Sequence, residues 1–521
     1  MRITTKVIQN NTLSNINNNK VLQDKLGNQM STQKKINRPS EDPVVAIRAL
    51  RLRSNVSQVT QYYEKNIPDA ESWMKVTEDA LTSVTEVITD LITQCQKGSS
   101  EKLATSDRNT ILDAIKALRD EVYSTGNSDY AGRSVFTGYR TDTTLKFTKA
   151  ETKLYSITEQ LENDMVDTVK FVDVAKLDNI TDVNFDQAPQ NAIEEAAVKE
   201  YDVHRIRLAY KNLDSDATTK LPTIQSVDGS INVTADKIAS TKDSPSPYIE
   251  INQPGNEDKC ILIKETGELL IGKDLYEKLM SLKDDAMTTG TNEGEFRVTY
   301  EKSDWVLNDL RPEHYFACTD KSDADSANWI NYNASYLTDA VREKQTIEYD
   351  VGLNQAIRVN TTADEVFTHA IGRDVDDLIN VMQEIDAMEK KLSQLKDLAE
   401  KNANDEAKSA TIKQQTEAAN KAMTYLNEKR QKLFEANITN MQGHLNTVNY
   451  ATTNCGTRQK KLELIQNRLM SQKTSFETLQ SENENVDISD VAIQLKGASM
   501  TYEASLMATS KILQTSLVNF L

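Results

Sequence analysis

Long apolar segments are absent from this chain of 521 residues. Only 38% of its residues are hydrophobic and 27% are charged, and no stretch approaches the roughly 18 to 20 consecutive apolar residues that span a bilayer. Residues 1–30 also lack an apolar core followed by a small-residue cleavage site, because residues 9–20 are polar and rich in asparagine. We therefore expect no membrane insertion and no cleaved signal peptide.

Cysteine and histidine are scarce, with four of each. The cysteines form no Cys-x-x-Cys pair and the histidines no His-x-x-x-His pair, the spacings typical of metal sites. The glycine pair at 290–294 lacks the lysine of a phosphate-binding loop. We expect free thiols, no catalytic residues, no metal site and no cofactor. The four cysteines are Cys95, Cys260, Cys318 and Cys455, and the four histidines are His204, His314, His369 and His444.

Positive charge is scarce except at one end. The net charge of -18 argues against nucleic acid as the main partner. Residues 1–53, however, hold ten Lys or Arg against three Asp or Glu, a local net charge of +7, so the remainder totals -25. The chain thus has a basic N-terminal segment attached to an acidic body.

Proline is missing from the last 209 residues, because all nine prolines lie between 39 and 312. A proline-free segment of this length favours long helices. Three apolar stripes at helical spacing, two before the middle of the chain and one after it, also predict helices. Pro68 marks either a helix start or a kink. The stripes are Leu81, Val84, Ile88, Leu91 and Cys95; Ile111, Ile115, Leu118 and Val122; and Leu378, Val381, Ile385, Met388 and Leu392.

The middle of the chain has a different character. Residues 126–138 indicate a helix stop, a turn and a short strand. Short strand-like runs then follow at 145–147, 231–233, 248–251, 261–263 and 296–300, with helical interruptions at 192–212 and 274–287. Residues 347–360 predict a β-hairpin with its turn near 352–354, or an edge strand. Trp305 and Trp329 lie in this region, which we expect to hold a folded core of its own.

Both chain ends carry apolar stripes without a core of their own. The first is sparse and diluted by asparagine, so we expect it to order only against a partner. The second begins after Asp487, a residue suited to capping a helix, and repeats at gaps of three, four or seven. We expect these helices to pair with each other and with neighbouring subunits, coupling folding to assembly. The predicted interface residues are Leu13, Ile16, Leu22, Leu26, Ile488, Val491, Leu495, Ala498, Tyr502, Leu506, Leu513, Leu517 and Phe520.

A loop followed by a helix start lies at 34–50. Ser40 is placed to cap the helix, acidic residues follow it, and a proline stands where the first turn tolerates one. The loop residues are Arg38, Pro39, Ser40, Glu41, Asp42 and Pro43. By local chemistry alone this pattern fits the helix start of any soluble protein.

The same segment resembles the signature loop of the flagellin superfamily. Pro39 and Pro43 stand where flagellins usually carry small residues, so the sequence of the loop is more similar to that of the junction proteins of this superfamily. Gly132, Arg133, Phe136 and Gly138 match, in order, a motif at the end of the helical arm of junction proteins. Gly456, Arg458 and Leu462 resemble a Gly-x-Arg helix of the same superfamily, with Thr457 in place of the frequent alanine.

This resemblance implies a structural subunit of the bacterial flagellum that forms a ring between hook and filament and couples them mechanically. Its implied partners are the first hook-associated protein, flagellin, copies of itself and an export chaperone, with no nucleic acid and no membrane insertion. The implied location is extracellular, at the hook-filament junction, after type III export without a cleaved signal peptide.

The expected fold class is α+β, with a long α-helical coiled-coil arm formed by both chain ends and a mostly β inserted outer region. We expect an export and assembly segment at 1–42, an N-terminal helical arm at 43–138, an outer region at 139–362, a C-terminal helical arm at 363–486 and an assembly helix at 487–521. Alternatives remain open: flagellin itself, a cytoplasmic coiled-coil scaffold, and an enzymatic or glycan-binding role for 140–362.

Overall fold

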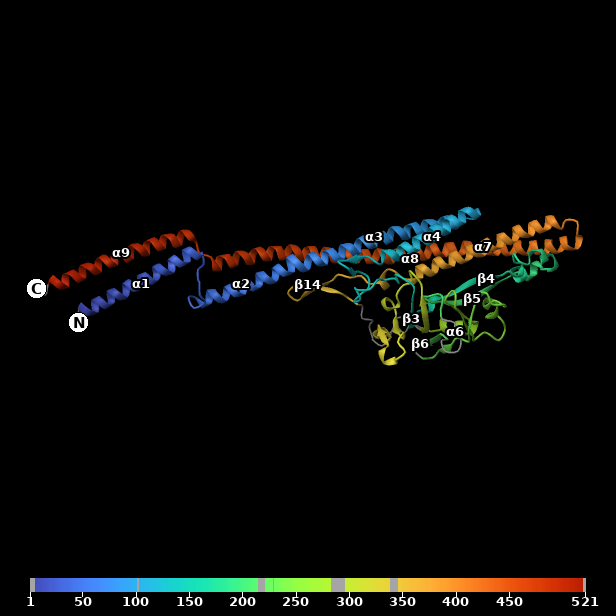
Figure 1. The fold of residues 1–521 in the computed structure, drawn as a ribbon, viewed down its shortest axis with the longest axis horizontal. Helices are drawn as coiled ribbons and strands as arrows, with labels where there is room; N and C mark the ends of the chain where they lie inside the picture. Colours follow the sequence, from blue (N-terminus) through green and yellow to red (C-terminus); the bar gives the residue numbers. More distant parts are fainter. Residues whose placement is uncertain are drawn as a thin grey trace. The chain divides into compact units, whose positions relative to one another are not determined.

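The computed structural model describes residues 5–100, 103–213, 221–227, 229–282, 296–337 and 345–518, with side chains from 6 to 511 at the two ends. The chain divides into two units. The first unit comprises 1–71, 349–357 and 459–521, and the second comprises 72–348 and 358–458. Long helices and a sheet-rich middle region give the predicted α+β class (Figure 1).

The first unit contains both chain ends. Helix α1 (Thr5–Thr32) lies side by side with α9 (Ile488–Val518), and the start of α1 lies at the same end of the pair as the end of α9 (Figure 1). Leu26, Val491 and Ala498 form its small buried cluster. The remaining elements are α2 (Pro43–Gln61), the π-helical segment η1 (Tyr62–Asn66), the start of α3 (Ile67–Gly98), the end of α8 (Glu406–Glu484), and the strands β14 (Glu348–Gly352) and β15 (Gln355–Arg358).

Pro68 neither starts a separate helix nor ends one. The helix runs from α2 through η1 into α3, and the Ile67 amide donates to the Tyr62 carbonyl five residues earlier. A proline cannot donate to the carbonyl four residues before it, so a local π turn next to Pro68 accommodates the missing hydrogen bond. The Asn66 side chain donates to the Asp350 carbonyl at 2.8 Å, which fastens this segment to the predicted hairpin.

The hairpin prediction at 347–360 is confirmed. Strands β14 and β15 form a two-stranded sheet of their own, and Asn354 in the turn between them has a φ of 53°. Asparagine adopts this left-handed conformation more readily than most residues, which suits it to a tight turn.

Helices of the second unit carry the stripes that the sequence predicted and bury them except for Leu118 and Leu392, which are partly buried. These helices are the rest of α3, α4 (Thr105–Thr125), α7 (His369–Lys401) and α8 up to residue 458. Leu81, Val84, Ile88, Leu91 and Cys95 are all fully buried. The sequence did not predict the break at 402–405, where α7 ends and α8 begins. Polar and charged residues surround this break, so no change in hydrophobic spacing marks it.

The turn predicted at 126–138 is confirmed. Strands β1 (Asp129–Tyr130) and β2 (Arg133–Ser134) form a tight antiparallel pair. Gly132 and Gly138 have φ values of 76° and 61°, a region that residues with a side chain rarely adopt. The Gly132 amide also donates to the Asp129 carboxylate at 3.1 Å.

Two larger sheets fill the middle region. One has the order β13-β12-β3-β11-β6-β7 and the other β4-β5-β10-β9-β8. All pairs are antiparallel except β8 with β9. Their strands are β3 (Glu151–Leu161), β4 (Val166–Asp173), β5 (Lys199–Arg207), β6 (Thr223–Ser226), β7 (Asn232–Thr234), β8 (Lys237–Ala239), β9 (Cys260–Ile263), β10 (Glu268–Ile271), β11 (Phe296–Trp305), β12 (Ala317–Asp320) and β13 (Ile330–Tyr332).

Short helices lie between and after these strands. They are η2 (Asn163–Met165), η3 (Ala175–Asn179), η4 (Phe185–Gln190), η5 (Glu195–Ala197), α5 (Pro247–Glu250), α6 (Lys273–Met280), η6 (Pro312–His314), η7 (Ser326–Asn328), η8 (Ala334–Leu337) and η9 (Ala363–Glu365). Elements η3 to η5 contribute Leu177, Ala188 and neighbouring residues to a core shared with α7 and α8.

Several local predictions for the middle region are wrong. The expected helix at 192–212 contains strand β5, because its alternating residues are held between β4 and β10. The expected strand at 248–251 begins as α5, since Pro247 occupies its first turn. Residues 145–147 make only an isolated bridge, from Lys146 to Leu310. Helix α6 confirms the predicted interruption as far as Met280, and residues 283–287 lie outside the described residues.

The predictions at 231–233, 261–263 and 296–300 are confirmed by β7, β9 and β11. Of the two tryptophans in this region, Trp305 is 1% exposed and Trp329 is 39% exposed. Trp305 stacks on Phe147 and meets Tyr155 and Tyr210 edge to face. The region therefore holds a core that includes Trp305, whereas Trp329 stands in the edge region of its sheet.

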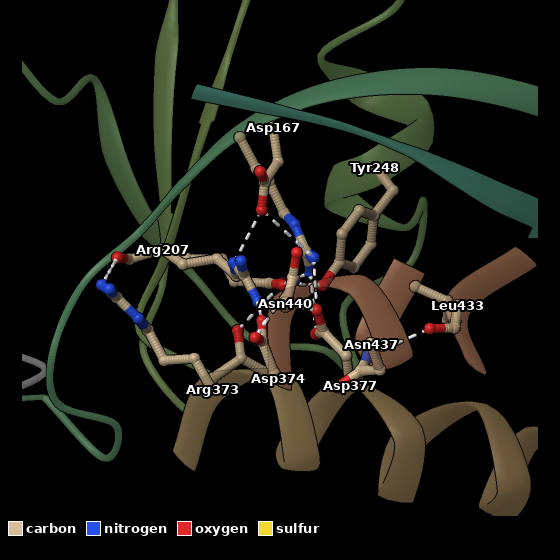
Figure 2. A network of polar contacts seen from close by, with 12 residues as sticks. Asp167, Arg207, Tyr248, Arg373, Asp374, Asp377, Leu433, Asn437 and Asn440 are labelled. Atoms are coloured by element: carbon tan, nitrogen blue, oxygen red, sulfur yellow. Dashed lines mark hydrogen bonds and ion pairs between the residues drawn. The ribbon is translucent and has the colours of Figure 1, made fainter. Parts of the chain in front are cut away.

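Buried charges join the five-stranded sheet to helix α7 (Figure 2). Arg207 on β5 pairs with Asp374 at 2.8 Å and with Asp167 of β4 at 2.6 Å. Arg205 pairs with Asp377 at 2.6 Å and also with Glu268 of β10. Burial alone lowers the pKa of Arg205, but the carboxylates of Asp377 and Glu268 raise it by more. The sheet is thus fixed to the helix by mutually compensating charges.

Candidate assembly interface

The signature loop is held against the junction between α8 and α9. The Lys35 amide donates to the Glu484 carbonyl at 2.8 Å, and the Val486 amide donates to the Gln33 carbonyl at 3.2 Å. Within the loop, the Asn37 amide donates to the Glu41 carboxylate at 3.1 Å. Segments more than 440 residues apart in the sequence are therefore joined by backbone hydrogen bonds, a pairing that spacing along the chain does not predict.

The helix that follows the loop is capped by Asp42, not by Ser40 as the sequence analysis expected. The Asp42 carboxylate accepts from the amides of Val44 and Val45 at 3.0 and 3.1 Å. Pro43 stands in the first turn as predicted. The helix begins two residues later than a Ser40 cap requires, and at that position a carboxylate satisfies the free amides and also meets the positive end of the helix. Arg38, Pro39 and Ser40 are exposed.

Glu484 is the centre of the charged contacts at this junction. Its side chain is 6% exposed and pairs with Arg53 at 2.6 Å and with Lys34 at 3.4 Å. Hydrogen bonding from Arg53, and then from Gln480 and Lys34, lowers the pKa of Glu484 from 4.5 to about 2, although burial by itself would raise it. The sequence analysis did not identify Glu484, because its partners Lys34 and Arg53 are distant in the chain.

The predicted terminal stripes are divided between two environments. Part of each stripe packs inside the α1–α9 pair, and part lies on its surface. Ile16, Leu26, Val491 and Ala498 are buried, Leu495 and Tyr502 are half-buried, and Leu13, Leu22, Ile488 and Leu506 are exposed. Polar contacts also cross the pair, from Asn19 to Ser505 and from Gln23 to Ser499. Leu513 and Leu517 belong to α9 but their side chains lie outside the description, and Phe520 lies outside the described residues.

Further apolar side chains on these helices are exposed and were not predicted. Val7, Ile8, Val21 and Met30 lie on α1, Ile493, Met500 and Met507 lie on α9, and Val44, Ile47 and Leu50 lie on the first turns of α2. Exposed apolar surface of this extent on paired helices is typical of a surface that another protein covers.

No group of three or more His, Cys, Asp or Glu side chains suited to a metal ion occurs in the part of the chain that the structure describes. The four cysteines are free and buried. Burial raises the pKa of Cys95 to about 12, a direction that disfavours the reactive thiolate. Among the described helices, none has the length and apolarity needed to cross a membrane.

The N-terminal part of the chain is similar to known proteins. Residues 3–141 match the model of the bacterial flagellin N-terminal helical region. The flagellar hook-associated protein 3 of Salmonella typhimurium is 32% identical over 143 residues, which are 27% of this chain and 45% of that protein. The protein of the same name from Escherichia coli is 31% identical over 144 residues, with the same coverage of 27% and 45%.

The crystal structure of the flagellar junction protein FlgL from Legionella pneumophila aligns with 85% of this chain and 100% of its own, at 9% identity and a TM-score of 0.28. The chain matches less than half of the length of the two hook-associated proteins. The signature loop and the motif from Gly132 to Gly138 both fall within the matched N-terminal region. The resemblance to the flagellin superfamily is therefore confirmed for residues 3–141.

Proposed function

We propose that this chain is a structural, non-catalytic subunit of the bacterial flagellum that joins hook to filament. The observation that carries the proposal is the match of the N-terminal region to two hook-associated proteins 3, at 32% and 31% identity. The α1–α9 pair supports it, because both helices expose apolar side chains that one chain leaves uncovered. Assembly of several copies would bury this surface and stabilise the terminal helices.

The proposal includes the neighbours of the chain. Copies of this chain form a ring, the first hook-associated protein lies below it, and flagellin lies above it. An export chaperone holds the chain before type III export without a cleaved signal peptide. The predicted interface residues of α1, α9 and the signature loop make the contacts between subunits. The exposed position of Arg38, Pro39 and Ser40 supports a role for the loop in such contacts.

Deletion of the gene in the source bacterium, followed by complementation, tests the proposal. We expect the deletion strain to release flagellin into the medium and to carry hooks without filaments. An epitope on the complementing protein should label one short band between hook and filament in electron micrographs.

Other distributions of the label would contradict this proposal. Labelling along the whole filament would identify a filament subunit, which the flagellin match of residues 3–141 keeps as the second candidate. Retention of the label inside cells, unchanged by deletion of residues 1–33, would indicate a cytoplasmic scaffold. Loss of export on that deletion is the result that the proposal requires.

A further inference from the structure

One face of helix α2 combines exposed apolar and cationic side chains. At about 100° per residue, Val44, Ile47, Arg48 and Arg51 lie within about 100° of arc on the helix surface. All four are exposed, and Ile47 keeps 53% of its surface accessible. We call these four residues the α2 face.

The arginines of the α2 face have no acidic partner among the described residues. Arg53, one turn farther along, differs from them because it pairs with Glu484 at 2.6 Å. The N-terminal segment that contains the α2 face has a net charge of +7 over residues 1–53. Unpaired arginine beside exposed aliphatic side chains is typical of protein interfaces, where arginine is enriched.

A complementary surface occurs on α3. Asp79, Glu86 and Asp90 are exposed and lie within about 40° of arc, since their spacings of seven and four residues bring them to one side of the helix. No cation lies within ion-pair distance of them in the described part of the chain. We call these three residues the α3 face. Thr82 and Ser83 beside them are also exposed, and the Ser83 hydroxyl donates to the backbone carbonyl of Asp79.

We propose that the α2 face of one copy docks on the α3 face of a second copy. Two guanidinium groups meet three carboxylates, and Val44 and Ile47 are covered in the same contact. Charge complementarity selects this occupant, because the chain that carries +7 at its N-terminal end carries -25 elsewhere. The inference rests on the proposed function, whose subunit contacts it specifies.

The pairing of two different faces has a consequence for assembly. Such a contact is heterologous, so each copy keeps one face of each kind available for the next copy. Repetition then closes a ring or extends a helix, whereas a contact between identical faces would stop at a dimer. The docking of α2 on α3 is therefore a contact that can build a ring.

Charge reversal in the full-length chain tests the docking. Arg48→Glu with Arg51→Glu should weaken self-association by about tenfold or more, because like charges then face each other. Asp79→Lys with Glu86→Lys should have the same effect. Combining all four substitutions in one chain, or mixing the two double variants, should restore association. Sedimentation and chemical cross-linking of the purified chain provide the readout, and filament attachment in the deletion strain provides a second one.

The matched control is Lys396→Glu with Lys413→Glu, which changes the net charge by the same amount at two exposed lysines elsewhere. This variant should associate like the wild type. If the α2 reversal weakens association no more than the control, or if neither the combination nor the mixture restores it, the docking is wrong. If only the docking is wrong, the wild-type chain still assembles between hook and filament. Failure of the proposed function would instead appear as a wild-type chain that does not assemble there.

Discussion

The two units differ in where their apolar and charged side chains lie. In the first unit, Leu22 and Ile493 are exposed on helices whose shared cluster has three buried members among the described side chains. In the second unit, Arg205 and Asp374 are buried and compensated, and Trp305 lies in an aromatic core. The buried charges of the second unit are compensated within the chain, whereas the terminal helices of the first unit expose apolar side chains. Under the proposed function, the apolar surface of the terminal helices serves assembly, whereas the buried charges and aromatic core of the second unit serve stability.

The largest predicted change is a loss of stability of the second unit when its buried ionic network is broken. Arg205→Ala leaves Glu268 buried without its cation, while Asp377 keeps only Arg207 at 3.1 Å, so we expect the free energy of unfolding of the second unit to fall by about 3 to 5 kcal/mol. Calorimetry and urea denaturation measure this loss. Lys390→Ala removes an exposed ion pair with Asp182 and should leave stability nearly unchanged. Equal effects of the two substitutions would show that the network does not fix the sheet.

Two leucines on α1 should separate stability from assembly. Leu26 is 4% exposed and Leu22 is 47% exposed. Leu26→Ala should destabilise the α1–α9 pair by about 2 to 3 kcal/mol, because it leaves a cavity, and hydrogen exchange of α1 amides measures this change. Leu22→Ala should leave exchange in the monomer unchanged but weaken self-association. If Leu22→Ala instead raises exchange as much as Leu26→Ala, Leu22 packs within the monomer.

Acid should loosen the junction around Glu484 between pH 4.5 and 2. The pKa of this carboxyl is lowered in the folded chain, so its stabilisation is complete above pH 4.5 and is lost as the pH falls toward 2. We expect a loss of about 1 to 2 kcal/mol, since the exposure of Arg53 reduces the effect.

Hydrogen exchange of residues 33–36 and 480–486 as a function of pH measures this loss. Glu484→Gln should remove the pH dependence between 4.5 and 2 while lowering stability at neutral pH. Persistence of the same pH dependence in that variant would assign it to another carboxyl group.

The smallest effect concerns the helix cap. Asp42→Ala should cost about 1 kcal/mol of local stability at the start of α2, because two amides lose their acceptor. Ser40→Ala should have no measurable effect, which makes it the control. Exchange rates of the Val44 and Val45 amides provide the measurement, and a larger effect of Ser40→Ala would restore the original assignment of the cap.

Sequence patterns predicted the features that depend on neighbouring residues. Helical stripes such as Leu378 to Leu392, the turn at Gly132 and the hairpin turn at Asn354 follow from spacing and from backbone preferences. The same reasoning failed for 192–212, where residues of alternating polarity became a strand because β4 and β10 supplied partners on both sides. Propensity is a weak guide where long-range pairing satisfies the backbone.

By itself, the sequence determined the α+β class, the helical ends, the signature loop and the resemblance of the N-terminal region to the flagellin superfamily. Only the tertiary structure decided that Asp42 caps α2, that Glu484 gathers cations from the other end of the chain, and which residues of the terminal stripes are exposed. The physical reason is that an apolar stripe or a charge in a sequence indicates only that its side chains need a partner. Burial and pairing depend on which distant residue the fold brings near.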